Sequence, residues 1–323
     1  MLKRIVALFT MLVVIFSVGT THAESETSRC GADLMIICAH PGDEYLFLGG
    51  ALPLYVGEQG RSAVVVYLSS ESEAQREQAK ESLAVYGDRV QAVFGDFSYA
   101  YTSTKDDAAK YWDINAVTGY IVGVIREYKP AIVITHDRNG EYGHGAHYLA
   151  FDATYQAVPF AAQAGRYAES TALYGTWQVQ RFFAHLYGET PVSLDRSQPL
   201  THFDGMSALE LDQACYQTYE KTYPIKMTDG DGYTCAKYCL VSAAEGTTFD
   251  PASGDLFDGI DESILTPKVT PAPKPTETPV PTPQPETGAE AQDTQQAAQT
   301  QEPARAEERR VGKECRSRWA PYH

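Results

Sequence analysis

The stretch DLMIICAHPGDEYLFLGG, residues 33–50, runs from an apolar segment directly into three polar side chains, His40, Asp43 and Glu44. Its first seven residues are almost uninterruptedly apolar, which is typical of a strand buried on both faces of a parallel sheet. The Pro-Gly pair that follows predicts a tight turn. The stretch therefore predicts a buried strand whose end presents metal-competent groups at the edge of a sheet.

The segments that follow alternate between strand-like and helix-like patterns. Apolar and β-branched runs predict strands, and amphipathic runs that end in Gly or Pro predict helices. This alternation favours an α/β fold, a Rossmann-like and mostly parallel sheet with helices on both faces. After residue 165 the pattern weakens. The expected strands are 33–39, 62–70, 90–95, 131–136, 177–188 and 236–243, and the expected helices are 44–60, 72–87, 106–129, 147–158 and 207–223.

A second polar stretch, THDRNGEYGHGAH at residues 135–147, repeats this layout about a hundred residues later. It lies between a predicted strand and the predicted helix that follows. In open α/β sheets, ligands bind at the carboxyl ends of strands near a topological switch point. His144 and His147 are three residues apart, so they share one face if they open a helix. Both stretches therefore fall where a site is expected.

Zinc favours imidazole nitrogen and carboxylate oxygen, and a catalytic zinc site uses three protein ligands plus water. His40 and Asp43 are three apart in one turn, and His144 and His147 are three apart in the other. Taken alone, the first motif also suits an ordinary turn, and the second also suits two solvent-facing imidazoles. Their joint position at strand ends favours a metal site.

Two motifs in this chain resemble the PIG-L/LmbE family of zinc-dependent N-deacetylases. The first strand of that family ends in Ala-His-Pro-Asp-Asp-Glu, and a later loop carries Gly-His-Pro-Asp-His or a relative. AHPGDE at 39–44 and GHGAH at 143–147 match these motifs in order and spacing. The resemblance covers roughly residues 32–260 and implies a zinc-dependent hydrolase that acts on an N-acetylated amino sugar, such as N-acetylglucosamine, or on a related amide.

Specific site residues follow from the resemblance by position. It implies that the zinc ligands are His40, Asp43 and His147. It gives His144 the role of polarising the substrate carbonyl and stabilising the tetrahedral oxyanion, with Tyr142 placed to assist. The implied partner is an amino-sugar or glycan substrate.

Two supporting carboxylates of the family are missing. Gly42 stands where the family has its general-base Asp, and Ala146 stands where an Asp orients the first loop histidine. General-base assistance contributes roughly 10²–10⁴ in rate, so its loss predicts slow turnover unless another residue substitutes. Glu44, Asp137 and Glu141 are the nearby candidates. Two functions stay open, a slow or re-wired zinc deacetylase and a catalytically impaired, metal-bound carbohydrate-binding domain.

The ends of the chain differ from its middle. Residues 1–23 have the basic start, apolar run and small residues of a secretory signal peptide. Residues 24–262 are expected to form the deacetylase-like domain. Residues 263–304 are rich in Pro and Thr and predict a disordered linker. Residues 305–323 resemble translated sequencing-adapter read-through and are left out of fold reasoning. We therefore expect a protein that is secreted or in the cell envelope, attached through a C-terminus that is missing here.

The charge of the chain excludes one class of partner. The formal net charge is −16 and the sequence pI is about 4.9. Nucleic-acid binding relies on Lys and Arg against phosphates, so this composition opposes it.

Three weaker signals accompany the two motifs. The aromatic residues within 95–112 suit either sugar stacking or core packing. His136 and Asp137 end a predicted strand, where they suit either support of a ligand histidine or the start of a turn. His185 has no ligand-like spacing to any other residue.

Overall fold

The computed structural model describes residues 31–186, 188, 191–219 and 235–269, all of which fall in one compact unit, Met1–Pro275. The predicted signal peptide at 1–23, the predicted read-through at 305–323 and the predicted linker from 270 onward lie outside these residues. Within the described ranges, no helix combines the length and the apolar character needed to cross a membrane.

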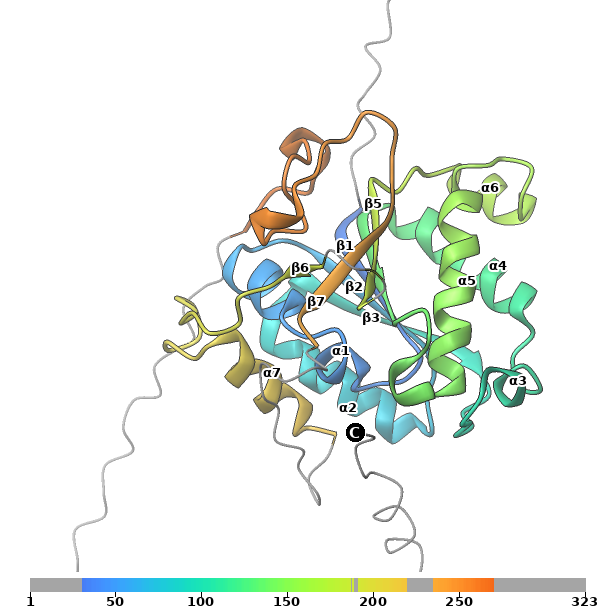
Figure 1. Ribbon diagram of the computed structural model, residues 1–323, viewed down its shortest axis with the longest axis horizontal. Coiled ribbons are helices and arrows are strands. Elements are labelled where there is room, and N and C mark those ends of the chain that lie inside the picture. The colour runs from blue at the N-terminus through green and yellow to red at the C-terminus, as the bar shows by residue number, and fades with distance from the viewer. Residues whose placement is uncertain (1–30, 187, 189–190, 220–234, 270–323) are drawn as a thin grey trace, which may run out of the picture. The chain divides into compact units, whose positions relative to one another are not determined.

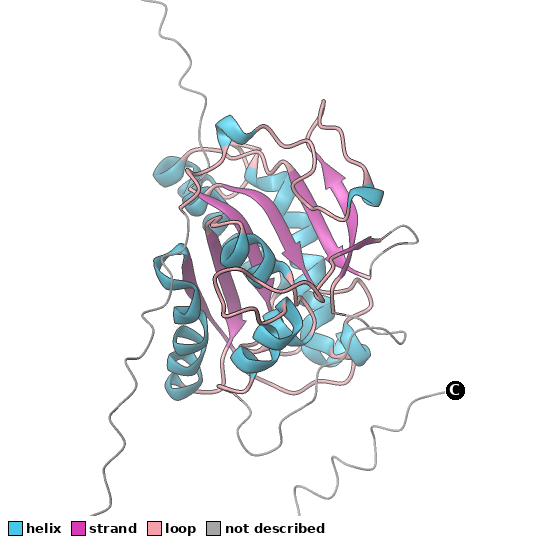
Figure 2. Cartoon of the chain, turned by 90° about the vertical axis from the view of Figure 1, so that its left-hand side faces the viewer, coloured by secondary structure: helices cyan, strands magenta, loops and turns pink. Residues whose placement is uncertain are grey.

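The described residues form a seven-stranded sheet in the order β3-β2-β1-β4-β5-β7-β6 (Figures 1 and 2). The first five strands in the chain pair in parallel, and β7 runs antiparallel to β5 and β6. The predicted mostly parallel α/β sheet is therefore confirmed. The strands are β1 (Ala32–Cys38), β2 (Ala63–Ser69), β3 (Val90–Phe97), β4 (Pro130–Thr135), β5 (Arg181–His185), β6 (Val192–Ser193) and β7 (Lys237–Ala243).

Helices cover both faces of this sheet. The group α3 to α6 lies on one face, and α1, α2 and α7 lie on the other (Figure 1). The central strands β1, β2 and β4 are buried along their whole length, which explains their continuous apolar runs. The helices are α1 (Asp43–Leu46), the π-helical η1 (Leu52–Glu58), α2 (Glu73–Leu83), α3 (Lys105–Ala108), α4 (Ile114–Tyr128), α5 (Gly145–Ala161), α6 (Ala168–Tyr174) and α7 (Ala208–Tyr216), with short 3₁₀ turns at η2 (Ala84–Arg89), η3 (Glu141–Gly143), η4 (Pro251–Ser253) and η5 (Glu262–Ile264).

The long helix predicted at 106–129 is two helices. Thr104 caps α3, and Asp113 caps α4 by accepting hydrogen bonds from the backbone N–H groups of Asn115 and Ala116. Between them, the indole N–H of Trp112 donates to the carbonyl of Ser98 at 2.9 Å. The side chains that favour capping therefore override the helical pattern between the two segments.

The helix predicted at 44–60 also divides, at the Gly49-Gly50 pair. Asp212 of α7 accepts a hydrogen bond from the backbone N–H of Gly50 at 2.7 Å and another from Arg196 at 3.1 Å, and both charged side chains are fully buried. A Cβ atom at Gly49 would lie 2.9 Å from the backbone carbonyl oxygen of Tyr45 and 2.8 Å from the Arg196 guanidinium, so a larger residue would displace its surroundings. This buried ion pair fixes the segment after α1 against α7.

The first residues of the predicted linker, 263–269, are among the described ones. Leu265 is buried, and the backbone N–H of Thr266 donates to Asp33 at 2.7 Å. The backbone N–H of Val269 donates to the carbonyl of Gly60 at 3.2 Å. These residues therefore pack beside the N-terminal ends of β1 and β2.

We predict that Asp212→Ala lowers the free energy of unfolding by about 3–5 kcal/mol, because it leaves the Arg196 charge buried without its partner. Urea denaturation measures this change. Glu77→Ala is the control, since it removes an exposed ion pair with Lys80 and should cost less than about 1 kcal/mol. Equal losses in the two variants would contradict the role given to the buried pair.

Candidate metal centre

The ends of β1 and β4 bring the two polar stretches together. These strands are neighbours in the sheet, with Ile37 opposite Thr135, and the strand order reverses between them. β1 leads into the turn that carries His40 and Asp43, and β4 leads into the loop that ends at His144. The site therefore lies at the topological switch point, where the topology predicts a ligand.

The three predicted zinc ligands are close to one another. Oδ2 of Asp43 lies 3.5 Å from Nδ1 of His40 and 3.5 Å from Nε2 of His147. Ligands at 2.0–2.2 Å from a tetrahedral zinc ion lie about 3.4 Å apart. His40, His144 and His147 also have ligand atoms within 4.8 Å of one another, as do Asp43, His136 and His147. The donor set and its spacing fit a divalent cation.

His136 is also near Asp43 but has a different role. Its Nε2 lies 3.3 Å from Oδ2 of Asp43 and accepts a hydrogen bond from the backbone N–H of Ala39 at 2.9 Å. The lone pair that a metal would need is therefore already engaged. Because Nε2 accepts, the hydrogen-bond pattern assigns the hydrogen to Nδ1, which faces Glu141 at 2.7 Å. His136 thus ties the end of β4 to the end of β1.

Imidazoles around Asp43 keep it ionised. Burial by itself would raise the pKa of this carboxyl, but the neighbouring His147, His136 and His40 outweigh burial and hold the pKa well below its usual range. Burial lowers the pKa of His147. A carboxylate beside a neutral imidazole is the protonation state that metal binding requires.

His144 stands immediately before α5, and its ring stacks on that of His147 at a centroid distance of 4.5 Å. Its Nδ1 atom is buried and has no hydrogen-bond partner among the described residues. Burial, together with His147 and His40, lowers the pKa of His144 to about 3. The ring is therefore neutral near pH 7.

Exposed tyrosines surround these imidazoles. Tyr99 is 45% exposed with its ring 5.2 Å from that of His40, and Tyr101 is 78% exposed with its ring 5.1 Å from that of His144. Tyr142 is 64% exposed and has a φ of 52°, which is unusual for a residue with a side chain. The aromatic segment 95–112 thus contains the buried Trp112, which packs in the core, as well as the exposed Tyr99 and Tyr101.

Gly42 lies in the turn between His40 and Asp43 with a φ of 101°, a conformation that favours glycine. A Cβ atom built there would meet the rings of Tyr216 at 3.4 Å and Tyr219 at 3.8 Å. The position that holds the family's general base is therefore covered by the end of α7 and the residues after it.

Glu44 lies beneath the same turn. One carboxylate oxygen accepts from the backbone N–H of Gly42 at 2.8 Å, and the other accepts from the hydroxyls of Tyr67 at 2.7 Å and Tyr219 at 2.6 Å. The side chain is only 1% exposed. Burial raises the pKa of Glu44 to about 7, although these hydrogen bonds oppose the rise. Glu44 thus stabilises the turn and does not face solvent.

Glu141 is the centre of a buried cluster of histidines that the sequence pattern did not predict. Its oxygens lie 2.7 Å from Nδ1 of His136, 2.8 Å from Nδ1 of His147 and 2.9 Å from Nδ1 of His185. His185, which has no ligand-like spacing in the sequence, is fully buried in this group. Its place at the end of β5, the strand next to β4, is the signal that would have pointed to it.

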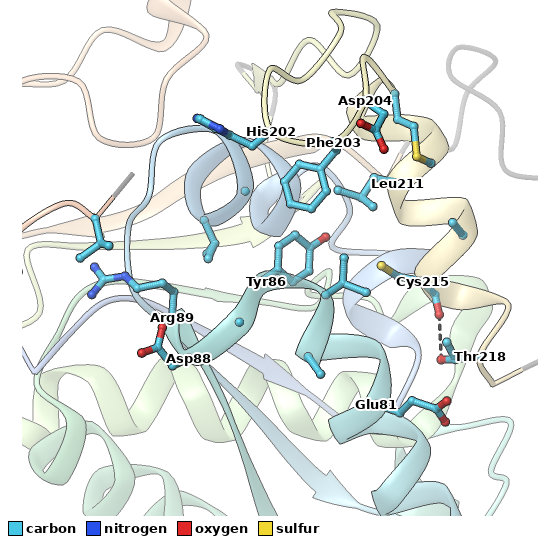
Figure 3. Close-up of a pocket in the computed structure, with 18 residues that line it drawn as sticks. Glu81, Tyr86, Asp88, Arg89, His202, Phe203, Asp204, Leu211, Cys215 and Thr218 are labelled. Carbon is cyan, nitrogen blue, oxygen red and sulfur yellow. Dashed lines mark hydrogen bonds between the residues drawn. The ribbon is translucent and has the colours of Figure 1, made fainter. Parts of the chain in front are cut away.

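A cavity of about 870 Å³ is lined by a different set of residues (Figure 3). Tyr86, Phe203 and Leu211 line it with other, mainly apolar, side chains from η2, the 202–206 loop and α7. None of the five residues grouped around the candidate metal position lines this cavity. This cavity and the candidate metal position therefore lie in different places in the fold.

Comparison with known proteins agrees with the position of this site. Residues 35–158 match the family model described as PIG-L: GlcNAc-PI de-N-acetylase, and this range contains every predicted site residue. This segment of the chain is therefore similar to the PIG-L family. The predicted resemblance to the PIG-L/LmbE family is thus confirmed.

Two curated relatives of the chain are 1D-myo-inositol 2-acetamido-2-deoxy-alpha-D-glucopyranoside deacetylases. The protein from Geodermatophilus obscurus is 29% identical over 178 residues, which is 46% of this chain and 60% of the relative. The protein from Thermobifida fusca is 26% identical over 180 residues, which is 47% of this chain and 60% of the relative. The chain thus matches about 60% of the length of each. Among solved structures, N,N'-diacetylchitobiose deacetylase from Pyrococcus horikoshii has a TM-score of 0.45 and 13% identity, covering 60% of this chain and 71% of that one.

We predict that Glu44 makes the stability of the metal-free protein fall as the pH rises. The pKa is about 7 in the folded protein and 4.5 ordinarily, so between those values the unfolded state ionises this group while the folded state keeps its proton, and unfolding becomes more favourable as the pH rises. One pKa unit corresponds to about 1.4 kcal/mol. The difference in the free energy of unfolding between Glu44→Gln and wild type should therefore shift in favour of the variant by about 3 kcal/mol when the pH rises from about 4.5 to about 8. Chemical denaturation at both pH values measures this, and a difference that does not change with pH would contradict it.

Proposed function

We propose that this protein is a zinc-dependent hydrolase that removes the acetyl group from an N-acetylated amino sugar. The observation that carries the proposal is the group formed by His40, Asp43 and His147, which has the donor types of a three-ligand zinc site and places Oδ2 of Asp43 3.5 Å from a ring nitrogen of each histidine. The group lies within the segment that is similar to the PIG-L family, and both curated relatives described above are named as deacetylases of an acetamido sugar conjugate.

Zinc suits this site better than a harder cation. Two imidazoles and one carboxylate match its ligand preference, and three protein ligands leave a position for water or substrate. A zinc ion bound there would lower the pKa of its water and polarise an amide carbonyl.

The chain's own residues supply the remaining steps. His144 is neutral near pH 7, so one ring nitrogen carries a hydrogen that it can donate to the carbonyl oxygen of the substrate as negative charge develops there. Tyr142 stands exposed at the rim of the site, where its hydroxyl can bind the same part of the substrate. The exposed rings of Tyr99 and Tyr101, beside His40 and His144, offer apolar faces to a sugar ring.

Proton removal from the attacking water is the step for which this site has no accessible carboxylate. Gly42 offers no carboxylate, and two of the three substitutes suggested by the sequence are engaged elsewhere, because Glu44 and Glu141 are buried and hydrogen-bonded. Asp137 accepts a hydrogen bond from the backbone N–H of Asn139 at 2.6 Å, and burial raises the pKa of its carboxyl. We therefore propose slow turnover.

A second candidate function is a carbohydrate-binding domain that holds a metal without hydrolysing its ligand. The observation that favours it is Gly42, which supplies no carboxylate where the family has its general base and whose φ of 101° favours glycine. In this case the site would recognise the acetamide and the exposed tyrosines would hold the sugar.

Export is part of the proposal. The signal-like residues 1–23 and the Pro/Thr-rich segment after the domain suit a protein outside the cytoplasm, held at the cell envelope.

We predict that the purified chain releases free amine from N-acetylglucosamine or its oligomers, and that a zinc chelator abolishes this release. An amine-specific fluorescent reagent measures the product, and zinc added back is the control. Saturable sugar binding with no amine released would favour the binding domain instead. A chain that contains no metal by elemental analysis would contradict both functions.

We predict that Gly42→Asp increases turnover relative to Gly42→Ala, by up to about 10²-fold, if the missing carboxylate limits the rate. Both variants carry the same backbone strain at φ 101°, which should cost about 1–3 kcal/mol of stability each. Gly42→Ala is thus the matched control, because only Asp adds a base. Equal turnover in the two variants, with zinc bound in both, would mean that another residue already removes the proton.

A further inference from the structure

The Glu141 carboxylate connects the two segments that carry the predicted metal ligands. It lies 2.7 Å from Nδ1 of His136 and 2.8 Å from Nδ1 of His147, and Nε2 of His136 in turn accepts the backbone N–H of Ala39. Ala39 is the residue immediately before His40. Glu141 therefore contacts the loop after β4 and the start of α5 directly, and it reaches the turn after β1 through His136.

Glu141 is itself held firmly in place. Its other oxygen accepts from the backbone N–H of Asp137 and lies close to Nδ1 of His185, both at 2.9 Å. It is fully buried, as are His136 and His185. Burial opposes its ionisation, but the imidazoles around it outweigh burial and keep the pKa of its carboxyl well below the usual range.

The consequence for His147 is a fixed ring orientation. With Nδ1 turned toward Glu141, Nε2 is the nitrogen that faces Asp43, at 3.5 Å. The Nδ1 contact is close but lies outside hydrogen-bond alignment, so Glu141 acts on this ring mainly through its charge and its position. A carboxylate behind a ligand histidine makes the imidazole a stronger ligand and fixes its tautomer.

We propose that Glu141 is a positioning residue that sets the zinc affinity of this site by orienting His147 directly and the His40 turn through His136. This inference rests on the proposed function, since it assigns a role toward the same metal. It also excludes Glu141 as the missing general base, because a fully buried carboxylate surrounded by three imidazoles cannot reach the water that attacks the substrate. Ala146 stands where the family has its orienting Asp, and Glu141 lies beside a different histidine, His147.

The test is the zinc affinity of the full chain, measured by competition with a chromophoric chelator. Glu141→Gln keeps the size of the side chain and removes its charge, and we expect it to weaken zinc binding by about 10–100-fold. Asp212→Asn is the matched control, because it removes another fully buried carboxylate without touching an imidazole, and it should leave zinc affinity unchanged.

The outcomes separate this inference from the proposed function. Wild-type affinity in Glu141→Gln would overturn the inference and leave the zinc hydrolase standing. A wild-type chain that takes up no zinc would overturn the proposed function and the inference with it. Equal weakening in Glu141→Gln and Asp212→Asn would reduce Glu141 to a structural role and also overturn the inference.

A second measurement covers the case in which Glu141→Gln does not fold. Histidine ¹⁵N NMR on the zinc-loaded wild-type chain identifies which ring nitrogen carries hydrogen, with His147 assigned by its loss in His147→Gln. We expect His147 to carry hydrogen on Nδ1 and to bind zinc through Nε2. Zinc bound through Nδ1 of His147 would be incompatible with a carboxylate positioned behind that nitrogen, and would overturn the inference.

Discussion

The parallel pairing of β1 with β4 is the constraint on which the site depends. Residues separated by about a hundred positions in the chain become neighbours because the backbone hydrogen bonds of these two strands align their carboxyl ends. The hydrogen bond from the N–H of Ala39 to His136 continues this pairing one step beyond the sheet. The His40 turn and the His147 helix start are held at a fixed separation as a result, and a site that must share one ion needs this rigidity.

Three carboxyl groups near the site are buried. Asp43, Glu44 and Glu141 are carboxylates within the protein interior, where an isolated negative charge is strongly unfavourable. Each is stabilised by a different kind of partner. Imidazoles surround Asp43 and Glu141, whereas Glu44 relies on a backbone N–H and two tyrosine hydroxyls. The difference explains why burial outweighs the partners only at Glu44, the one carboxyl of the three whose pKa is raised.

Helix α7 links the site to the rest of the domain. Asp212 at its middle holds the Gly49-Gly50 segment through a backbone hydrogen bond. Its last residue, Tyr216, and the following Tyr219 pack over Gly42. A Cβ atom at position 42 would make ordinary van der Waals contact with these rings, so the positive φ of the turn is what favours glycine there. This feature keeps the binding-domain alternative open beside the hydrolase.

The sequence by itself determined the fold class and the ligand candidates. Continuous apolar runs predict buried parallel strands, and the motifs AHPGDE and GHGAH stand at the strand ends where such a fold binds its ligands. These signals are local, because each depends on a few adjacent residues. Local capping also explains where the sequence misled, since Asp113 divides a helix that the apolar pattern joined.

Only the tertiary structure decided which polar residues face the candidate metal position and which are held by hydrogen bonds to other groups. His185 and Glu141 lie 44 positions apart and meet because β5 lies beside β4. His136, which has the same residue type as a ligand, is engaged by a backbone N–H from the residue that follows β1. Side-chain chemistry can be read along the chain, but which nitrogen is free depends on contacts between distant segments. Those contacts exist only after the sheet has assembled.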